Sequence, residues 1–476
     1  MPYHLYTPRF IFDIMPSKEA ILREMVKASY WWERGAVDEK DALPYKRRIF
    51  GELLAELDER RITGIIGARR TGKTTLMYQL VRALLEKGVD AKSVLMFSFD
   101  NPLMSADEQI IPKVLETYRE TFQLKGTAFV FLDEVQYVKD WSRWLKGFHD
   151  RKEPFKFVVS GSSGTLIYKD TSESLAGRVS FHRVGPFSFP EFAEYHDPKL
   201  GKFLEELGGI RTEELFSDRV RARIEFHKGE ALSLFNRYLI QGGIPEAFQQ
   251  ELKAGQKWLR SDYVGLVFYR DLMKLFEVRD IRTLEELFFF AVNAHAQRIN
   301  YSRIAGALGT RIETVKQYLG YLEAVKMVTL LNCHSRSAKK VIRAEKKIYI
   351  ADSGLRNAVL GAAEEILADE QQASFEVEGI VGAHLDAKFS TDLSRNVYFW
   401  RSLHELDFVA DDRRELMPVE VKYSSNVDAR DLRGLLTFME EFGVTLGYVV
   451  TKDLLRKEGN LLYIPAWLFL CMIAGR

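Results

Sequence analysis

Cysteine, net charge and long apolar runs are all scarce in this chain of 476 residues. Its two cysteines, Cys333 and Cys471, lie far apart and match no metal-ligand spacing, so they fit a reduced, cytoplasmic setting. The 68 basic and 67 acidic side chains leave a formal charge of +1, which excludes a chain-wide attraction to nucleic acid and leaves only a local basic patch for such contacts. The most apolar stretch, residues 461–474, is interrupted by Pro465 and is too short to cross a bilayer. The N-terminus also lacks a signal-peptide layout, so no membrane partner is expected.

A phosphate-binding loop is the most informative feature that is present. Residues 67–74 read GARRTGKT and match the pattern GxxxxGK[ST], between a run typical of a buried strand and a segment with helical spacing of apolar residues. A glycine-bearing turn at this place directs backbone N–H groups and the positive end of a helix at one spot. Lys73 is expected to reach the β- and γ-phosphates, and Thr74 to ligate Mg²⁺. The residues expected to contact the nucleotide are Gly67, Arg70, Gly72, Lys73, Thr74 and Thr75, with the alternative that the side chains of Arg69 and Arg70 point away.

Two carboxylates follow a second apolar strand. Residues 128–134 read AFVFLDE, about sixty residues after the loop, and a further strand, residues 93–100, lies in between. Acidic pairs after apolar strands are common and often merely solvated. The assignment of a function to this pair therefore depends on its distance from the phosphate-binding loop and on the strand in between. Asp133 at the strand tip is expected to hold the Mg²⁺ shell, and Glu134 to polarise the attacking water.

Polar residues after a third strand complete the expected site. Residues 156–160 form this strand, and a turn with Gly161 follows. Ser160 or Ser162 is the candidate sensor of the γ-phosphate, against the alternative of simple turn chemistry. Arg178 follows 18 residues after Ser160 and would stabilise transition-state charge in its own or a neighbouring site, with a surface salt bridge as the equal alternative.

The motifs GARRTGKTT, FLDEVQ, FVVSGSS, SLAGR and PFSFPEF together resemble one family. This family comprises the archaeal and bacterial ATPases that carry an AAA-type core followed by a domain of unknown function, the MNS group near the STAND NTPases. The resemblance extends over nearly the whole chain and is specific for the set of motifs rather than for any one of them. It implies a P-loop core of the class with an extra catalytic glutamate, and ATP as the nucleotide. No motif of the sequence itself decides between adenine and guanine.

Residues 186–285 are helical and charged, which predicts a helical lid behind the P-loop core. Within them, Gly242 and Gly243 permit a tight turn and Pro245 fixes the next one. A helix–helix connection is the interpretation that physics favours. The stretch is also similar to the GxP element that STAND ATPases place against the bound nucleotide, and this resemblance makes Pro245 a candidate sensor of nucleotide state.

Residues 287–350 have the element order of a winged helix. A helix over 287–297 is followed by a helix at 301–308, a turn at Gly309, a helix over 312–324 and two strands around a basic hairpin. The helix after the short glycine turn is the one that enters a major groove, and the hairpin would meet phosphates. The candidate DNA-contacting residues are Arg311, Thr314, Lys316 and Gln317 on the helix and Arg336, Lys339, Lys340 and Arg343 in the wing. The alternative is a winged helix that serves as an intramolecular packing or switch module, as in STAND ATPases.

Charged side chains near the C-terminus form the second chemical pattern. Asp407 lies on one predicted strand, and Glu420 and Lys422 share one face of the next because they are two residues apart. A predicted helix from residue 375 adds Glu378. The three carboxylates would bind Mg²⁺ while Lys422 orients or activates water. The set resembles the restriction-endonuclease-like core with its D…ExK signature, and the structural alternative is an ion-paired sheet edge in which Lys422 only neutralises Glu420.

The sequence therefore predicts a multidomain α/β protein with a P-loop, AAA-type ATPase core. The predicted parts are an N-terminal arm (1–45) whose Trp31 and Trp32 pack against the core, the ATPase core (46–186), the helical lid (187–286), the winged helix (287–350) and a restriction-endonuclease-like α/β domain (351–476). Two functions stay open. In one, ATP binding and hydrolysis are coupled to the binding or processing of DNA. In the other, the protein is a STAND-like switch whose ATP turnover controls assembly with a protein partner or with further copies of itself, and the nuclease fold is inactive.

Overall fold

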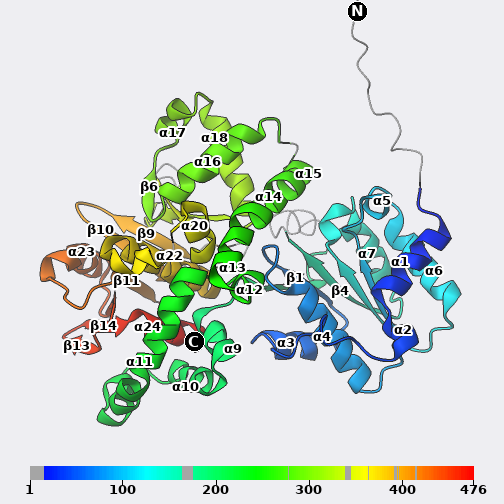
Figure 1. Ribbon diagram of the computed structural model, residues 1–476, viewed down its shortest axis with the longest axis horizontal. Helices are drawn as coiled ribbons and strands as arrows, with labels where there is room; N and C mark the ends of the chain where they lie inside the picture. The colour runs from blue at the N-terminus through cyan, green and yellow to red at the C-terminus, as the bar shows by residue number, and fades with distance from the viewer. Residues whose placement is uncertain are drawn as a thin grey trace, which may run out of the picture. The chain divides into compact units, whose positions relative to one another are not determined.

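The computed structural model describes residues 15–162, 175–276, 278–337, 345–362, 364–390, 394, 396–412 and 415–475 (Figure 1). The chain forms two compact units. Residues 1–67 and 72–184 make up the first unit, and residues 68–71 and 185–476 make up the second. Each unit has its own sheet and its own apolar core.

The first unit is built on a parallel sheet of five strands in the order β2-β3-β4-β1-β5. The strands are β1 (Ile62–Ile66), β2 (Val94–Ser98), β3 (Ala128–Asp133), β4 (Phe155–Gly161) and β5 (Val179–Arg183). β1 and β4 are buried along their whole length, which is why their sequences lack the alternation of a half-exposed strand. β4 lies between β1 and β3, which is the order expected for the ATPases with an extra catalytic glutamate. The ends of these three strands therefore meet at one edge of the sheet.

Helices cover both faces of this sheet (Figure 1). They are α1 (Lys18–Ala28), α2 (Trp31–Arg34), α3 (Phe50–Glu56), α4 (Lys73–Glu86), α5 (Pro102–Ser105), α6 (Ile110–Thr121) and α7 (Trp141–Asp150), with the 3-10 turns η1 (Ala91–Ser93) and η2 (Val135–Tyr137). Helices α1, α6 and α7 share one apolar core with Ile62 and Ile66 of β1. Helices α2, α3 and α4 share the other core with Ile65, because successive side chains of a strand point to opposite faces.

Two neighbouring tryptophans fasten the N-terminal arm to this unit. The indole N–H groups of Trp31 and Trp32 both donate to the carbonyl oxygen of Val94, at 3.0 and 2.8 Å. Trp31 is fully buried in the core that contains α4. The prediction that these aromatic rings pack against the ATPase core is confirmed.

The second unit begins with helices, as predicted for residues 186–285. They are α9 (Phe189–His196), α10 (Pro198–Gly208), η3 (Glu214–Phe216), α11 (Asp218–Gln241), α12 (Pro245–Phe248) and α13 (Leu252–Trp258). The last of these continues as alternating π- and α-helical segments, η4 (Leu259–Tyr263), α14 (Val264–Leu266), η5 (Val267–Leu272) and α15 (Met273–Phe276).

A sheet of nine strands follows, in the order β13-β14-β12-β11-β10-β9-β7-β8-β6. The strands are β6 (Gln297–Ile299), β7 (Val328–Cys333), β8 (Lys346–Ile350), β9 (Val397–Arg401), β10 (Glu405–Asp411), β11 (Leu416–Lys422), β12 (Gly447–Thr451), β13 (Arg456–Glu458) and β14 (Leu461–Pro465). β7 and β9 run parallel; in the described part of the chain their register pairs Asn332 with Tyr398 and Cys333 with Phe399, and the N–H of His334 also donates to the carbonyl oxygen of Phe399 at 2.6 Å. The sheet therefore runs across residue 350, where the sequence suggested a domain boundary.

Further helices of the second unit are α16 (Ile281–Asn293), α17 (Tyr301–Ala307), α18 (Ile312–Ala324), α20 (Ser353–Leu360), α21 (Glu365–Ala368), α22 (Glu370–Phe389), α23 (Arg433–Phe442) and α24 (Ala466–Gly475). Helices α16, α18, α20, α22, α23 and α24 pack on this sheet, whereas α17 packs on α18 and α21 on α22 (Figure 1). α18 has the bounds that the sequence predicted. α16 begins at Ile281, six residues before the predicted start, because the side chain of Asp280 caps it by accepting from the N–H of Thr283.

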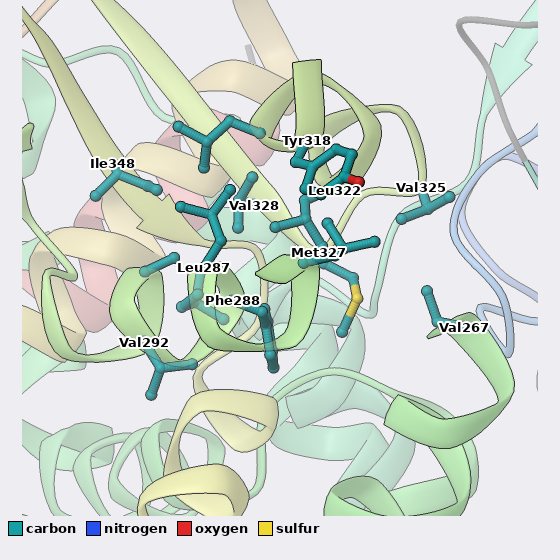
Figure 2. Close-up of a cluster of buried hydrophobic side chains, with 14 of the residues drawn as sticks. Val267, Leu287, Phe288, Val292, Tyr318, Leu322, Val325, Met327, Val328 and Ile348 are labelled. Atoms are coloured by element: carbon teal, nitrogen blue, oxygen red, sulfur yellow. The ribbon is translucent and has the colours of Figure 1, made fainter. Parts of the chain in front are cut away.

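The core between α16, α18 and the strands β7 and β8 is drawn in Figure 2. Leu287, Phe288 and Val292 of α16, Tyr318 and Leu322 of α18, Val328 of β7 and Ile348 of β8 point toward one another there. This packing fixes the exposed face of α18 on a rigid support. None of the helices in the described ranges combines the length and the apolar character that crossing a bilayer requires.

Candidate nucleotide site and C-terminal carboxylate cluster

The P-loop connects the end of β1 to the start of α4, as predicted. α4 begins at Lys73, and Gly72 before it has a φ of 91°, a left-handed conformation that glycine adopts without strain. The loop is fastened to β4 because the N–H of Gly67 donates to the carbonyl oxygen of Gly161 at 3.2 Å. The buried ammonium of Lys73 donates to the carbonyl oxygen of Gly67 at 3.1 Å. Lys73 therefore lies over the loop whose backbone N–H groups would surround a phosphate.

Hydrogen bonds join four of the predicted site residues at the adjacent strand ends. The hydroxyl of Thr74 donates to Oδ2 of Asp133 at 3.0 Å. The hydroxyl of Ser160 donates to the other oxygen of Asp133, and its Oγ accepts from the N–H of Glu134 at 3.2 Å. Burial, and then the charge of Glu134, raise the pKa of Asp133 to about 6. A buried carboxylate beside a hydroxyl is an oxygen donor set that suits Mg²⁺, which keeps several waters and phosphate oxygens in its shell. The residues present fit this ion.

Glu134 is held in an uncommon backbone conformation. Its φ of 56° lies in the left-handed region, which costs a non-glycine residue on the order of 1 kcal/mol and persists where the surroundings enforce it. The amide of Gln136 donates to a carboxylate oxygen of Glu134 and, at 2.9 Å, to Oγ of Ser162. Sequence reasoning missed Gln136, although it stands two residues after Glu134 in the FLDEVQ motif. Gln136 connects the glutamate to the serine of the neighbouring turn.

The remaining candidates of the first unit lie as follows. Ser160 is fully buried, and its hydroxyl is engaged by Asp133 and the backbone of Glu134. Thr75 is half-buried in the first turn of α4. Arg178 forms a two-pronged ion pair with Asp150, at 2.7 and 3.2 Å, which is the surface salt bridge that the sequence left as an alternative.

Two candidates belong to the second unit. Arg70 is grouped with this unit and pairs there with Glu246 at 2.9 Å. Pro245 opens α12 after a turn in which the N–H of Gly243 donates to the buried carboxylate of Asp352 at 2.7 Å. A Cβ atom on Gly242, which has a φ of 70°, would lie 2.2 Å from Oδ1 of Asp352. The turn therefore requires glycine and is fixed by the N-terminal cap of α20.

The C-terminal candidates converge as predicted. Glu378 comes from α22, Asp407 from β10, and Glu420 and Lys422 from β11. β10 is antiparallel to both β11 and β9. The register of its pairing with β9 shifts between residues 406 and 409, so this irregularity includes Asp407. Such a bulge redirects a side chain. Lys422 contacts Glu420 at 2.7 Å.

A lysine that the sequence did not single out lies among these carboxylates. The ammonium of Lys347, on β8, is 2.6 Å from Glu378 and 3.1 Å from both Glu405 and Asp407. Its side chain is 3% exposed. The hydroxyl of Tyr349 donates to Glu378 at 2.7 Å. Glu378, Glu405, Asp407 and Glu420 are called the carboxylate cluster below.

The lysine remains charged in this setting. Burial lowers the pKa of Lys347, but the surrounding acidic groups, Glu378 foremost, more than offset this and raise the pKa well above its ordinary value. Burial raises the pKa of Asp407, but the two lysines, Lys347 first, bring it to a net value below the ordinary one. Burial and the charge of Asp407 raise the pKa of Glu378 to about 7 and that of Glu420 to about 8. Lys347 and Asp407 therefore form a stable ion pair, whereas Glu378 and Glu420 exchange a proton near neutral pH.

A divalent metal ion does not fit this network. At an effective dielectric constant of 20, two like unit charges about 4 Å apart repel by about 4 kcal/mol, so a divalent ion beside Lys347 would lose about 8 kcal/mol of its attraction to the carboxylates. One oxygen of Asp407 already accepts from Lys347, and the other accepts from the N–H of Val421 at 3.0 Å. Within the described ranges, three or more His, Cys, Asp or Glu side chains are nowhere grouped so that they could hold a metal ion. The prediction that Glu378, Asp407 and Glu420 hold Mg²⁺ did not include Lys347, whose ammonium contacts Glu378 and Asp407.

The predicted DNA-contacting face of α18 is exposed. Arg311, Lys316 and Gln317 lie on it, and Thr314 is half-buried. Arg336 packs over the ring of Phe442, with its guanidinium carbon 4.9 Å from the ring centroid. The other three basic residues of the predicted wing, Lys339, Lys340 and Arg343, lie outside the described residues.

Three family matches cover most of the chain. Residues 59–193 match the AAA domain family, residues 232–365 match a domain of unknown function (DUF8612), and residues 375–469 match another domain of unknown function (DUF4143).

Relatives with similar length exist in archaea and bacteria. The uncharacterized protein MJ1544 of Methanocaldococcus jannaschii is 23% identical over 431 residues, which are 88% of either chain. An uncharacterized protein of Haemophilus influenzae is 21% identical and covers 82% of this chain and 90% of its own. The uncharacterized protein Rv2008c of Mycobacterium tuberculosis is 23% identical and covers 79% of this chain and 74% of its own.

Solved structures of ATPases are similar only at a low level. The Walker-type ATPase PABY2304 of Pyrococcus abyssi is 15% identical, covers 74% of this chain and 100% of its own, and has a TM-score of 0.36. The ORC1 protein of Aeropyrum pernix, solved in complex with DNA, is 13% identical, covers 74% of this chain and 94% of its own, and has a TM-score of 0.30. The family match and the geometry of the P-loop together identify an AAA-type P-loop ATPase domain in residues 59–193 of this chain.

Proposed function

We propose that this chain binds ATP with Mg²⁺ at the P-loop of its AAA-type domain and hydrolyses it. The observation that supports the proposal is the series of contacts from Thr74 through Asp133 and Ser160 to Glu134. In this series a hydroxyl and two carboxylates lie at one edge of the sheet, and the proposal assigns metal binding to the first carboxylate. These are the groups that phosphoryl transfer to water requires.

Each residue has a separate task in this proposal. Lys73 and the backbone N–H groups of the loop bind the β- and γ-phosphates. Thr74 and Asp133 hold Mg²⁺, which neutralises charge on the phosphate oxygens when bound. Glu134 orients the attacking water and accepts its proton. Gln136 keeps the carboxylate of Glu134 in position, and Ser160 is a positioning residue for Asp133 rather than a direct sensor of the γ-phosphate.

Release of inorganic phosphate from ATP tests the proposal. Lys73→Ala should lose nucleotide binding, because the phosphate charges lose their cation. Glu134→Gln should still bind ATP but turn over at least about a hundredfold more slowly, which is the usual contribution of a general base. Glu86→Gln, an exposed glutamate at the end of α4, is the matched control and should behave like the wild type. Normal hydrolysis by Glu134→Gln would contradict the assignment. Competition between ATP and GTP decides the base specificity.

We propose further that residues 281–350 form a winged helix that contacts DNA with the exposed face of α18. The element order α16, β6, α17, α18, β7, β8 is that of a winged helix. Binding to duplex DNA should weaken as salt rises, and replacing Arg311 or Lys316 by alanine should each reduce the salt slope by about 1. Lys253→Ala, an exposed lysine on α13, is the control.

The second candidate function is the STAND-like switch, which the fixed turn at Gly243 and Pro245 favours. In that case nucleotide state changes the assembly of the protein. Sedimentation should then differ between ADP and a non-hydrolysable ATP analogue. Absent or salt-insensitive DNA binding together with a changed sedimentation coefficient would favour this function over the first. Identical sedimentation in both nucleotides would count against it.

The C-terminal part, we propose, has a restriction-endonuclease-like fold without metal-dependent cleavage. The order α22, β9, β10, β11, α23, β12 supports the fold, and the position of Lys347 among the acidic groups argues against the metal. Linear, flapped and four-way DNA should stay intact with Mg²⁺ or Mn²⁺, with and without ATP. Cleavage that disappears in Lys422→Ala would overturn this part of the proposal.

A further inference from the structure

Lys347 has the contacts of a bound cation rather than of an ordinary core lysine. An ammonium group has three N–H donors, and three carboxylates lie within 3.1 Å of its nitrogen. These carboxylates come from α22 and from two positions of β10, so they are brought together by the fold and not by neighbouring positions in the chain.

The charges around the cluster are nearly balanced by protein cations alone. Its four carboxylates face Lys347, Lys422 and Arg298, the last of which is 3.0 Å from Glu405 and also 2.9 Å from Glu345 outside the cluster. Within the described residues, Oε2 of Glu420 is buried without a hydrogen-bond partner, so the protein cations do not satisfy every oxygen of the cluster; loss of Lys347 would leave Glu378 and Asp407 without their cation as well.

Lys347 also contacts carboxylates of a strand that lies three strand positions away in the sheet. β8 is separated from β10 by β7 and β9, and three strand spacings amount to about 14 Å in a flat sheet. The contact between Lys347 and Asp407 therefore requires the sheet to curl between these strands. The pairing of β7 with β9 through two residue pairs allows such a curl.

We infer that Lys347 is a built-in cation that takes the place of a divalent metal ion in the carboxylate cluster and clasps the β6–β8 part of the sheet to α22 and β10. The ammonium of Lys347 then keeps a metal ion out of the carboxylate cluster. With Lys347 in place, these carboxylates are not grouped so that they could hold a metal ion, and we expect them to regroup around a divalent ion only when the lysine is removed. This inference stands apart from the proposed ATPase function, since none of its residues belongs to the P-loop site.

Mn²⁺ binding tests the inference directly. All proteins carry Asp133→Asn, so that the P-loop site contributes no ion, and bound Mn²⁺ is counted by electron paramagnetic resonance without nucleotide. Lys347→Met should gain about one Mn²⁺ per chain, with an affinity at least about tenfold above that of the parent. Lys346→Met, the neighbouring lysine of β8, should gain none. Lys347→Met combined with Asp407→Asn should lose the gained site.

Two results would overturn the inference. Mn²⁺ bound by the parent and lost on Asp407→Asn would show that lysine and metal share the cluster. Equal absence of Mn²⁺ from the parent and from folded Lys347→Met would show that the carboxylates are not a latent metal site. If Lys347→Met fails to fold, Lys347→Gln, which keeps a donor of similar length, is measured in its place under the same criteria. Melting temperature with and without Mn²⁺ gives a second readout, because only the variant that lost its cation should be stabilised by the ion.

Discussion

Replacing Ser160 by alanine separates a positioning role from a sensing role at the nucleotide site. The hydroxyl of this fully buried residue donates to Asp133 and accepts from the N–H of Glu134. Ser160→Ala removes both bonds and leaves a buried backbone donor without its acceptor. Such a group costs about 1–3 kcal/mol, so the free energy of unfolding of the ATPase unit should fall by about 2 kcal/mol.

The same substitution should change the dependence on Mg²⁺. The hydrogen bond from Ser160 lowers the pKa of Asp133, whereas burial and the charge of Glu134 raise it. Without that bond the pKa rises further above 6, and fewer molecules at neutral pH carry the ionised carboxylate that the metal needs. The Mg²⁺ concentration for half-maximal phosphate release should therefore increase about tenfold at pH 7. The difference from the wild type should narrow as the pH rises, because Asp133 is then ionised in both proteins.

Two assays test these expectations. Denaturant unfolding measures the loss of stability, and phosphate release at graded Mg²⁺ concentrations and pH values measures the Mg²⁺ requirement. Ser162→Ala is the matched control, since the hydroxyl of Ser162 accepts from Gln136 instead. It should slow turnover without shifting the Mg²⁺ requirement. If Ser160→Ala kept both the stability and the Mg²⁺ dependence of the wild type, the positioning role would be refuted. If Ser160→Ala had a lower turnover but an unchanged Mg²⁺ dependence, the result would instead support a role of Ser160 as sensor of the γ-phosphate.

Four further outcomes are expected. Gln136→Ala should lower kcat about tenfold with little change in KM, because it releases the carboxylate that orients water; an unchanged kcat would contradict this. Arg178→Ala should change the free energy of unfolding by less than about 1 kcal/mol, as for other exposed ion pairs, and a severe loss of phosphate release at intact stability would instead support the transition-state role. Trp31→Ala should cost about 3–5 kcal/mol in denaturant unfolding, and a loss below 1 kcal/mol would mean that the arm is not part of the core. Glu420, whose pKa burial raises to about 8, binds a proton in the folded state that the unfolded state releases above its ordinary value of 4.5. Folding stability should therefore fall from about pH 5 to pH 8, with further contributions from Glu378 and Asp133, whose pKa values are also raised, and Glu420→Gln should reduce this slope; an unchanged slope would contradict the assignment.

Local patterns made the strand–loop–helix geometry of the P-loop predictable. The strand, the glycine-bearing turn and the helix around Lys73 are neighbours in the chain, so composition and spacing suffice to place them. The bounds of α18 were equally accessible, because Gly309 ends the preceding turn and apolar residues then recur at helical spacing. Contacts between adjacent strand ends, such as Thr74 with Asp133, follow from the rule that parallel strands end at one edge.

Lys347 was not predictable in the same way. It is one of two adjacent lysines before an apolar run, and nothing in the sequence distinguishes it from Lys346. Its partners lie 31 and 60 residues further along the chain, at Glu378 and Asp407, and on elements that are not its neighbours in the sheet. Only the curl of the sheet brings them together. The D…ExK pattern located the carboxylates correctly, but a pattern of acidic residues does not reveal which cation they hold.

The short parallel pairing of β7 with β9 affects how this chain folds and which of its segments can be exchanged with those of relatives. Two family matches divide the region at about residue 370, yet one sheet spans both of them. A protein cut after residue 350 would leave the end of β7 as an open edge and Lys347 as a buried charge without acceptors, so it should aggregate rather than fold. During synthesis this part of the sheet has to wait until β10 has been made, since the acceptors of Lys347 lie on it and on α22. Shuffling of either half between relatives should therefore succeed only when both halves are exchanged together.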